Sequence, residues 1–232
     1  MKRTLFVYIL LTFLFAGCQG PGNVDKSTEP LIKKKGAKGG FISFNSNGEI
    51  KVDEKLLEKY NFEVLWTFPL KKRITKCYLI KDALYVYTPS EKALYSFDRR
   101  SGHVKWFFVL KEGLTFKPAL WEYNKEDQKI TGIYKSDEVA VISQNRVYII
   151  EKEHGNEITS IPLGGIAPSA PPGIHKYNVF VCGWDNRIYA FSKESGIEVW
   201  RYLTDGDIKA QPLATSDYIK SDLVFVGSTD GR

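Results

Sequence analysis

The side chains in this sequence that could most readily do chemistry are three histidines and three cysteines. His103, His154 and His175 are scattered, and the first two fall at or beside expected turns, where we expect exposure. None of these residues has the spacing of a metal site, and neither GxGxxG nor GxSxG is present. The sequence therefore predicts no catalytic residue, no metal and no cofactor.

One cysteine is suited to a covalent attachment. Lys2 and Arg3 precede an apolar stretch, residues 5–15, which is typical of a secretory signal and shorter than the about 20 residues that span a bilayer. The following "LFAGC" resembles the lipobox of bacterial lipoproteins, with Phe15 in a less usual place. This resemblance implies cleavage before Cys18 and lipid attachment to its sulfur and new amino group. A plain signal peptide with a free Cys18 is the alternative. Since Gln19 is not the aspartate that retains lipoproteins on the inner membrane, the outer membrane is implied in a diderm.

The rest of the chain contains an internal repeat. The stretches "SFDRRSGHVKW" and "AFSKESGIEVW" are similar, and self-similarity at a fixed period indicates a repeat architecture. Four anchor positions, residues 66, 106, 159 and 200, lie at spacings of 40, 53 and 41. Trp66, Trp106 and Trp200 occupy three anchors and Thr159 the other. The period is therefore near forty, with one insertion of about a dozen residues.

Each repeat has the parts of several short strands. Pro118, Pro171 and Pro212 each follow an anchor by twelve residues and suit the start of a strand, because proline has no N–H. Runs such as "ALYVY", "VAVI", "VFVC" and "LVFV" come next and indicate strands. Pairs such as Asp185-Asn186 then suit a tight hairpin turn.

The second long strand of each repeat ends at a glycine, namely Gly102, Gly155 or Gly196, where we expect a positive φ. In "RIYAF" and "LVFV" successive residues are apolar, so both faces of these strands should be covered. These features predict an all-β fold, a β-propeller of four-stranded antiparallel blades with about four repeats and an incomplete ring. A β-sandwich is the alternative, although sandwiches lack a fixed register.

The last repeat stops at "GSTDGR", where the pattern requires two more strands. Truncation is the favoured interpretation. The alternative is closure from the front, with "GGFISFNSNGEIKV", its Asn47-Gly48 turn and a strand at Trp66 supplying the missing half-blade.

Cys77 and Cys182 lie in different repeats. An exported protein could pair them, but in a four-repeat ring they would lie on alternate, non-adjacent blades. Two buried thiols are therefore the favoured prediction.

The repeat resembles a known family at specific positions. "AFSKESGIEVW" matches the pattern A-x-D-x-x-T-G-x-x-x-W of PQQ-like (quinoprotein-type) propeller repeats, with Ser192 and Ser195 in place of Asp and Thr. The resemblance runs from about residue 63 to residue 232. It implies a structural role for Trp66, Trp106 and Trp200, which pack between adjacent blades in that family.

The resemblance does not by itself imply an enzyme. Quinoprotein dehydrogenases carry adjacent cysteines, a calcium site and eight blades, whereas this chain has no adjacent cysteines and about four repeats. A lipidated propeller is more similar to the BamB-type lipoproteins of the outer-membrane β-barrel assembly machinery. That family is non-enzymatic and docks onto a protein partner through its propeller face and loops. A fragment of a PQQ-dependent dehydrogenase, or an envelope propeller that binds a glycan or another ligand, is the alternative.

We expect three parts in the chain: a lipoprotein signal peptide (1–17), a flexible tether on a lipid anchor (18–38) and the propeller repeats (39–232). These parts differ in net charge. The whole chain carries +6, of which Lys2 and Arg3 supply two and the tether a net three, so residues 39–232 carry +1. A near-neutral body is not typical of a nucleic-acid binder. We therefore expect no nucleic-acid partner. The resemblance to BamB-type lipoproteins implies an envelope protein as the partner, with the β-barrel assembly machinery as a candidate, and a membrane contact through the lipid.

Two stretches are candidates for partner contact. The insertion after Pro118 brings Trp121, Tyr123 and Tyr134 to an expected loop or added hairpin, and aromatic loops are common contact surfaces. Trp184, beside the Asp185-Asn186 turn, is the second candidate. For both stretches the alternative is packing against a neighbouring blade.

Overall fold

The protein is described by a computed structural model in which residues 42–44, 50–52, 55, 59, 64–132, 134–216 and 222–231 are placed. Two compact units are distinguished, Met1–Ile74 with Arg100–Gly102, and Thr75–Arg99 with His103–Arg232. Cys18, the signal peptide and the tether lie outside the described residues. In the first unit β1 (Ile42–Phe44) pairs antiparallel with β2 (Ile50–Val52). The Asn47-Gly48 turn expected between these strands also lies outside the described residues.

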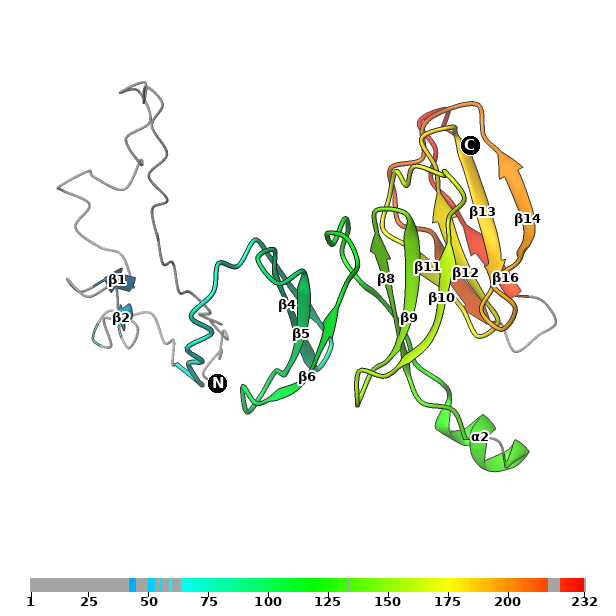
Figure 1. The fold of residues 1–232 in the computed structure, drawn as a ribbon. Coiled ribbons are helices and arrows are strands. Elements are labelled where there is room, and N and C mark those ends of the chain that lie inside the picture. Colours follow the sequence, from blue (N-terminus) through cyan, green and yellow to red (C-terminus); the bar gives the residue numbers. More distant parts are fainter. Residues whose placement is uncertain are drawn as a thin grey trace, which may run out of the picture. The chain divides into compact units, whose positions relative to one another are not determined.

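The second unit is built from four-stranded antiparallel sheets, each formed by four consecutive strands (Figure 1). The first sheet contains β3 (Lys76–Ile80), β4 (Ala83–Thr88), β5 (Ala93–Asp98) and β6 (Val104–Val109). The second contains β7 (Ala119–Trp121), β8 (Glu138–Ser143), β9 (Arg146–Glu151) and β10 (Glu157–Pro162). The third contains β11 (Gly173–Ile174), β12 (Asn178–Cys182), β13 (Arg187–Ser192) and β14 (Glu198–Leu203). These sheets are propeller blades, as the sequence predicts.

A further pair, β15 (Leu213–Ser216) and β16 (Asp222–Phe225), forms a two-stranded sheet. The prediction that "LVFV" is covered on both faces was wrong. Val224 and Val226 pack against the core, whereas Leu223 and Phe225 are exposed. The physical reason is that β16 pairs only with β15 among the described strands, and one face of this pair packs on the third blade.

Local backbone chemistry explains where the strands begin and end. Pro118 and Pro212 directly precede β7 and β15, as predicted for residues without an N–H. Asn186 has a φ of 61° in the turn between β12 and β13. The predicted positive φ is confirmed at all three repeat glycines, with 71° at Gly102, 76° at Gly155 and 69° at Gly196.

The register of the last two strands repeats from blade to blade. The anchor residue always pairs with the residue that stands ten positions before it, and a register shift lies next to this pair in every blade. The pairs are Ser96↔Trp106, Ile149↔Thr159 and Ala190↔Trp200. The anchors found in the sequence are therefore equivalent in structure. Trp66 differs, because residues 64–70 form no strand, so the expected strand at Trp66 was wrong.

The core lies between neighbouring blades. One cluster joins Tyr85 and Leu94 of the first blade to Val141 and Ile150 of the second. Another joins the second blade to the third, with Ile149 and Val181 among its fully buried members. Strands β9 and β13 are buried from their second to their fifth residue, which confirms the expectation for "RIYAF".

The insertion after Pro118 forms no hairpin: Tyr123 and Tyr134 lie in loop segments, as expected, whereas Trp121 belongs to β7. It contains a short helix, α2 (Lys125–Thr131), which stands out from the second blade in Figure 1. Asn124 caps the start of the helix by accepting a hydrogen bond from the Glu126 N–H at 2.9 Å. Gly132 ends the helix in the left-handed conformation, with a φ of 69°. These caps favour a helix over the extended chain that a hairpin needs.

Both propeller cysteines are free. The prediction of two buried thiols holds for Cys182, which lies in the core beside Phe180, but is wrong for Cys77, which is exposed. The reason is that β3 has one covered and one open face, and Cys77 lies on the open face.

The two thiols should therefore react very differently with an alkylating reagent. Burial raises the pKa of Cys182 to about 12, so at pH 8 only about one molecule in ten thousand carries a thiolate there. We expect iodoacetamide to modify Cys77 in the native protein and Cys182 only after unfolding, as read by peptide mass spectrometry. Equal rates in the native protein would contradict the buried position of Cys182.

Candidate functional site

The tryptophan at one anchor contacts the glycine turn of the following blade. Trp106 on β6 is 6% exposed, and a Cβ at Gly155 would lie 2.6 Å from its Cγ. The Trp106 Nε1 donates a hydrogen bond to the Lys152 carbonyl oxygen at 2.7 Å. Trp66 lies over Gly102 in the same way, so that a Cβ there would overlap the indole. Both indoles therefore pack against a glycine turn, and the indole of Trp106 is buried there.

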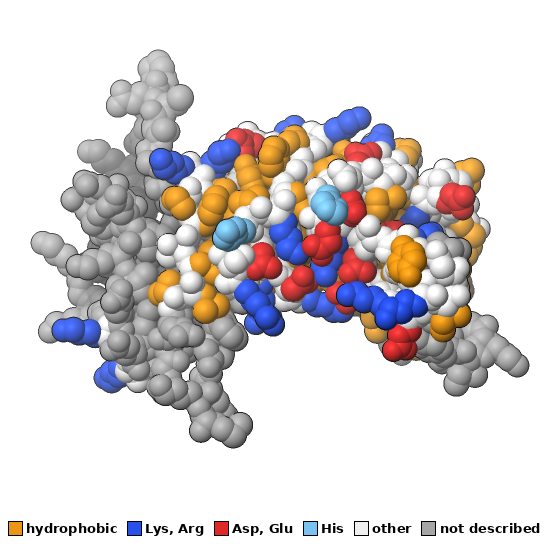
Figure 2. Space-filling model, turned by 90° about the horizontal axis from the view of Figure 1, so that it is seen from below, with side chains coloured by type: hydrophobic (Ala, Val, Ile, Leu, Met, Phe, Trp, Pro, Cys, Tyr) orange, Lys and Arg blue, Asp and Glu red, His pale blue; other side chains and the backbone are white. Residues whose placement is uncertain are grey.

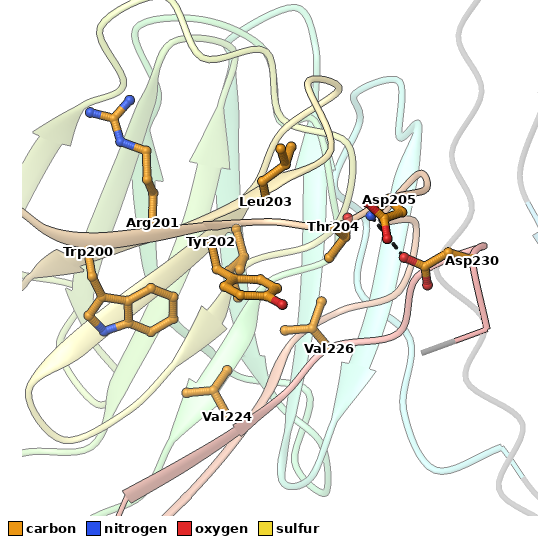
Figure 3. A pocket seen from close by; sticks show the side chains of 10 residues that line it. Trp200, Arg201, Tyr202, Leu203, Thr204, Asp205, Val224, Val226 and Asp230 are labelled. Atoms are coloured by element: carbon orange, nitrogen blue, oxygen red, sulfur yellow. Dashed lines mark hydrogen bonds between the residues drawn. The ribbon is translucent and has the colours of Figure 1, made fainter.

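Trp200 lies in a different environment. Its indole is 39% exposed, and it borders a hollow of about 520 Å³ between β14 and β16. Figure 3 shows Trp200 and Tyr202 on the β14 side of this hollow, with Val224 and Val226 opposite. The walls are mostly apolar, and at one end the Asp205 N–H donates to the Asp230 carboxylate at 2.9 Å. This arrangement can hold apolar side chains beside the carboxylate of Asp230.

Gly196 also lacks the contact that Gly102 and Gly155 make. The nearest atom to a Cβ at Gly196 is Ile161 Cγ1, at 3.8 Å. Thr159 stands where the other repeats have tryptophan, and none of its atoms lies within 4 Å of that Cβ. The third repeat glycine therefore keeps its backbone conformation without an indole above it.

Trp184 lies at the rim of an open recess of about 650 Å³. Its side chain is 60% exposed, while its backbone N–H donates to the Ala167 carbonyl at 3.0 Å. Charged side chains near this recess are paired: Arg201 with Glu198 at 2.7 Å, and Arg187 with Asp185 at 3.0 Å. The recess therefore offers an exposed ring and neutralised polar groups.

The insertion residues expected to contact a partner are divided between the interior and the surface. Trp121 packs against the core, with its ring centroid 4.9 Å from that of buried His175. Tyr123 is 8% exposed, whereas Tyr134 is 74% exposed. The structure therefore leaves Tyr134 and Trp184 accessible, buries Tyr123 and leaves Trp121 partly buried.

A buried ion pair holds the base of the insertion. Lys193 Nζ lies 2.5 Å from Glu138 Oε2, and the Tyr123 hydroxyl donates to Glu138 Oε1 at 2.9 Å. Burial lowers the pKa of Lys193, although the hydrogen bond and charge of Glu138 oppose this effect. Burial and the Glu138 charge both raise the pKa of Tyr123. This group is enclosed and fully engaged, which indicates a structural role.

A second group of charges joins the first blade to the second. Lys152, whose side chain is 6% exposed, lies 2.9 Å from Asp82, 3.3 Å from Glu122 and 3.7 Å from Asp137. Burial works to raise the pKa of Asp82, but the hydrogen bond and charge of Lys152 and the charge of Lys105 hold it below its usual value. Acidic and basic side chains gather on the face seen in Figure 2. Because these charges neutralise each other, the group fits a structural clamp between blades.

Metal chemistry finds no support in the part of the chain that is described. No three histidine, cysteine, aspartate or glutamate side chains there form a group that could hold a metal ion. His103 and His154 are exposed beside turns, as predicted. No helix in the described ranges is long and apolar enough to span a membrane.

Sequence reasoning missed one exposed apolar residue. Ile130 on α2 is 83% exposed, more than any other large apolar side chain among the described residues. The capping residues Asn124 and Gly132 were the available signal, because recognition of the helix would have placed Ile130 on a short, otherwise polar helix.

Stacked four-stranded antiparallel blades with an interblade tryptophan define the class of a β-propeller built from PQQ-like repeats. The comparison with protein families agrees: the family described as "Outer membrane protein assembly factor BamB" matches residues 118–232. The chain is a PQQ-like propeller repeat protein that is similar to BamB.

Two of the matching solved structures support the fold. Two crystal structures of BBS1N in complex with ARL6DN, soaked with mercury and with lead, match at 15% and 16% identity with TM-scores of 0.51 and 0.54. The alignments cover 71% and 74% of this chain but 51% and 54% of those chains. BamB from Moraxella catarrhalis matches at 17% identity with a TM-score of 0.44, covering 69% of this chain and 45% of that one. The chain thus spans about half the length of the structures that it matches. No curated protein matches its sequence.

Proposed function

We propose that this chain is a non-enzymatic lipoprotein propeller that acts as a protein-interaction scaffold in the bacterial cell envelope, with a BamB-like role in the assembly of outer-membrane β-barrel proteins. The observation that carries the proposal is the match of residues 118–232 to the BamB family, over blades whose interior is occupied by packing contacts. The lipobox supports a location at the membrane surface, with Cys18 acylated. The near-neutral propeller supports a protein partner.

The experiment is an affinity purification of the membrane-anchored protein from its native envelope after crosslinking. We expect mass spectrometry to find a barrel-assembly protein among the crosslinked partners and acyl chains on Cys18. The matched control is Cys18→Ser, which should leave the propeller folded but release it from the membrane fraction. Recovery of a dehydrogenase subunit or a bound quinone instead would refute the scaffold proposal and support a fragment of a PQQ-dependent enzyme.

A ligand-binding propeller is the second candidate, and the recess at Trp184 favours it. An exposed indole beside paired polar side chains can stack on a sugar ring while carboxylates and guanidinium groups accept and donate hydrogen bonds. Calorimetric titration with envelope glycan fragments tests this candidate, with Trp184→Ala as the variant that should abolish binding. If wild type and Trp184→Ala give the same heats, a glycan site at this recess is excluded.

A further inference from the structure

The hollow beside Trp200 is bounded on one side by an unpaired strand edge. Among the described strands β16 pairs only with β15, whereas β8 and β12, the second strands of complete blades, each pair with a strand on both edges. The hollow of about 520 Å³ lies between β16 and β14. Because an unpaired strand edge is a template on which another strand can form backbone hydrogen bonds, the hollow is open to a further strand.

The position that corresponds to this hollow in the second blade is filled by a strand. Strand β9 pairs with β8, and its Tyr148 and Ile150 belong to the same core cluster as Trp106 of β6. The Tyr148 ring also meets the Phe108 ring edge to face, with 5.3 Å between their centroids. A strand with large apolar side chains at alternate positions therefore covers the two rings of β6.

Trp200 and Tyr202 of β14 hold the same two positions in the third blade. Trp106 and Trp200 have the same place in the blade register, and each is followed by a second ring two residues later. Over Trp200 and Tyr202, which are 39% and 66% exposed, lies the hollow instead of a strand (Figure 3). A strand added to β16 would lie about 4.8 Å from it and about 10 Å from β14, the spacings of paired strands and of stacked sheets. Its alternate side chains would then fill the hollow.

The turn after β9 supplies the rest of the cover over Trp106. Gly155 lies five residues after Ile150 and brings the backbone against the indole, and the Lys152 carbonyl accepts the indole N–H at 2.7 Å. The Trp200 Nε1 has no such acceptor among the residues that the structure describes. An occupant matched to the hollow therefore carries a glycine turn after its apolar positions.

The end of the hollow at which the added strand would begin is acidic. Asp205 and Asp230 lie at this end (Figure 3), and the basic residue of the lining, Arg201, pairs with Glu198 at 2.7 Å. The isolated bridges that precede the turn are equivalent in the second blade, where the corresponding end is the start of β9 at Arg146. An occupant that begins with a basic residue, as β9 does, is therefore complementary in charge to this end.

We propose that the hollow between β14 and β16 accepts a β-strand of a protein partner, which pairs with β16, packs alternate apolar side chains on Trp200 and Tyr202 and ends in a glycine turn. This inference rests on the proposed scaffold function, and it names the surface and the kind of segment that the scaffold binds. A lipid chain fits less well, because it would fill the apolar space but leave the backbone groups along the β16 edge without hydrogen bonds.

The probe is a synthetic peptide with the sequence of residues 146–159, which contains β9 and its glycine turn. Its binding to the full chain, in detergent with the lipid anchor in place, is followed by the fluorescence anisotropy of a label on the peptide. We expect saturable binding that weakens about 10-fold or more in the peptide variant Tyr148→Ser with Ile150→Ser. The matched control, Val147→Ser with Ile149→Ser, changes the opposite side of the strand and should weaken binding less than about threefold.

Changes in the protein locate the site. Trp200→Ala with Tyr202→Ala should weaken peptide binding about 10-fold or more, whereas Tyr177→Ala with Ile197→Ala, which removes exposed side chains from the same blade, should keep it within about twofold. Tyr202→Glu alone should weaken binding and keep the wild-type melting temperature, because this side chain is 66% exposed. Arg146→Glu in the peptide should weaken binding, and this loss should shrink at high salt. If the hollow and control variants bind alike, or if the wild type shows no saturable binding, the inference is wrong.

A photocrosslinker at position 202 in the native envelope identifies the source of the strand. We expect it to attach to another protein, within a segment that alternates apolar side chains. Attachment to a second copy, attachment elsewhere in the same chain, or no attachment would each overturn the inference. The scaffold proposal has its own test, the recovery of a barrel-assembly protein. Recovery of that protein without attachment at position 202 would leave the scaffold and remove the strand site, whereas attachment of a different protein would support the strand site and contradict the assembly role.

Discussion

Alanine at Gly155 is expected to lower the free energy of unfolding by about 2–5 kcal/mol, whereas alanine at Gly164 should lower it by about 1–2 kcal/mol. Both glycines have a positive φ, 76° and 58°, so both substitutions place a side chain in the left-handed region. Only at Gly155 would the new Cβ also meet the Trp106 indole, at 2.6–2.7 Å. Because backbone strain is common to both variants, the difference between their losses of unfolding free energy measures the cost of the contact with Trp106.

The collision should displace a specific group of atoms. Trp106 cannot move away from Gly155 without losing the hydrogen bond from its Nε1 to the Lys152 carbonyl, and Lys152 carries the ion pairs with Asp82 and Glu122. Urea unfolding followed by circular dichroism gives both free energies. If Gly155→Ala and Gly164→Ala cost the same, then the contact between Trp106 and the turn contributes nothing to stability.

The repeat could be predicted from sequence because its signals are local. The spacing between glycine and tryptophan fixes a hairpin register, so residues 106, 159 and 200 occupy equivalent places even though Thr159 replaces tryptophan. The positive φ at the glycines follows from the turn alone. These features depend on residues no more than ten positions apart, which is why the blade pattern was predictable.

Errors arose where distant residues decide the outcome. The apolar run of β16 has the same composition as a buried strand, but which of its faces is covered depends on what stands beside the sheet. The unexpected exposure of Cys77 has the same cause, because Cys77 lies on the open face of β3. The burial of Tyr123 depends on Lys193, seventy residues away in sequence. The local amino-acid composition carries no information about these contacts with distant residues. The helix α2 is a different case, because its caps at Asn124 and Gly132 are visible in the sequence.

The buried pair at the base of the insertion should be the most costly ion pair to break. Glu138→Ala is expected to lower the free energy of unfolding by about 3–5 kcal/mol, because it leaves the Lys193 ammonium enclosed without a counter-charge. Glu138→Leu combined with Lys193→Met should recover most of this loss, since neither charge is then buried. Asp207→Ala is the control, because the side chains of its pair with Lys209 are 46% and 58% exposed and should contribute less than about 1 kcal/mol.

The pH dependence of Glu138→Ala gives a second readout with a defined sign. Burial lowers the pKa of Lys193 in the folded protein, and removal of Glu138 takes away the group that opposes this effect. When the pKa of a lysine is lower in the folded protein than in the unfolded protein, its charge lowers the free energy of unfolding. This loss is complete below the pKa of the folded protein, and it is relieved as the pH rises toward the pKa of the unfolded protein, about 10.4. The loss of unfolding free energy in Glu138→Ala, relative to wild type, should therefore become smaller between pH 7 and pH 10. The small loss in Asp207→Ala should stay the same. A deficit in Glu138→Ala that is constant across this range would mean that Lys193 reaches water in the variant, and the loss would then reflect packing and not an uncompensated charge.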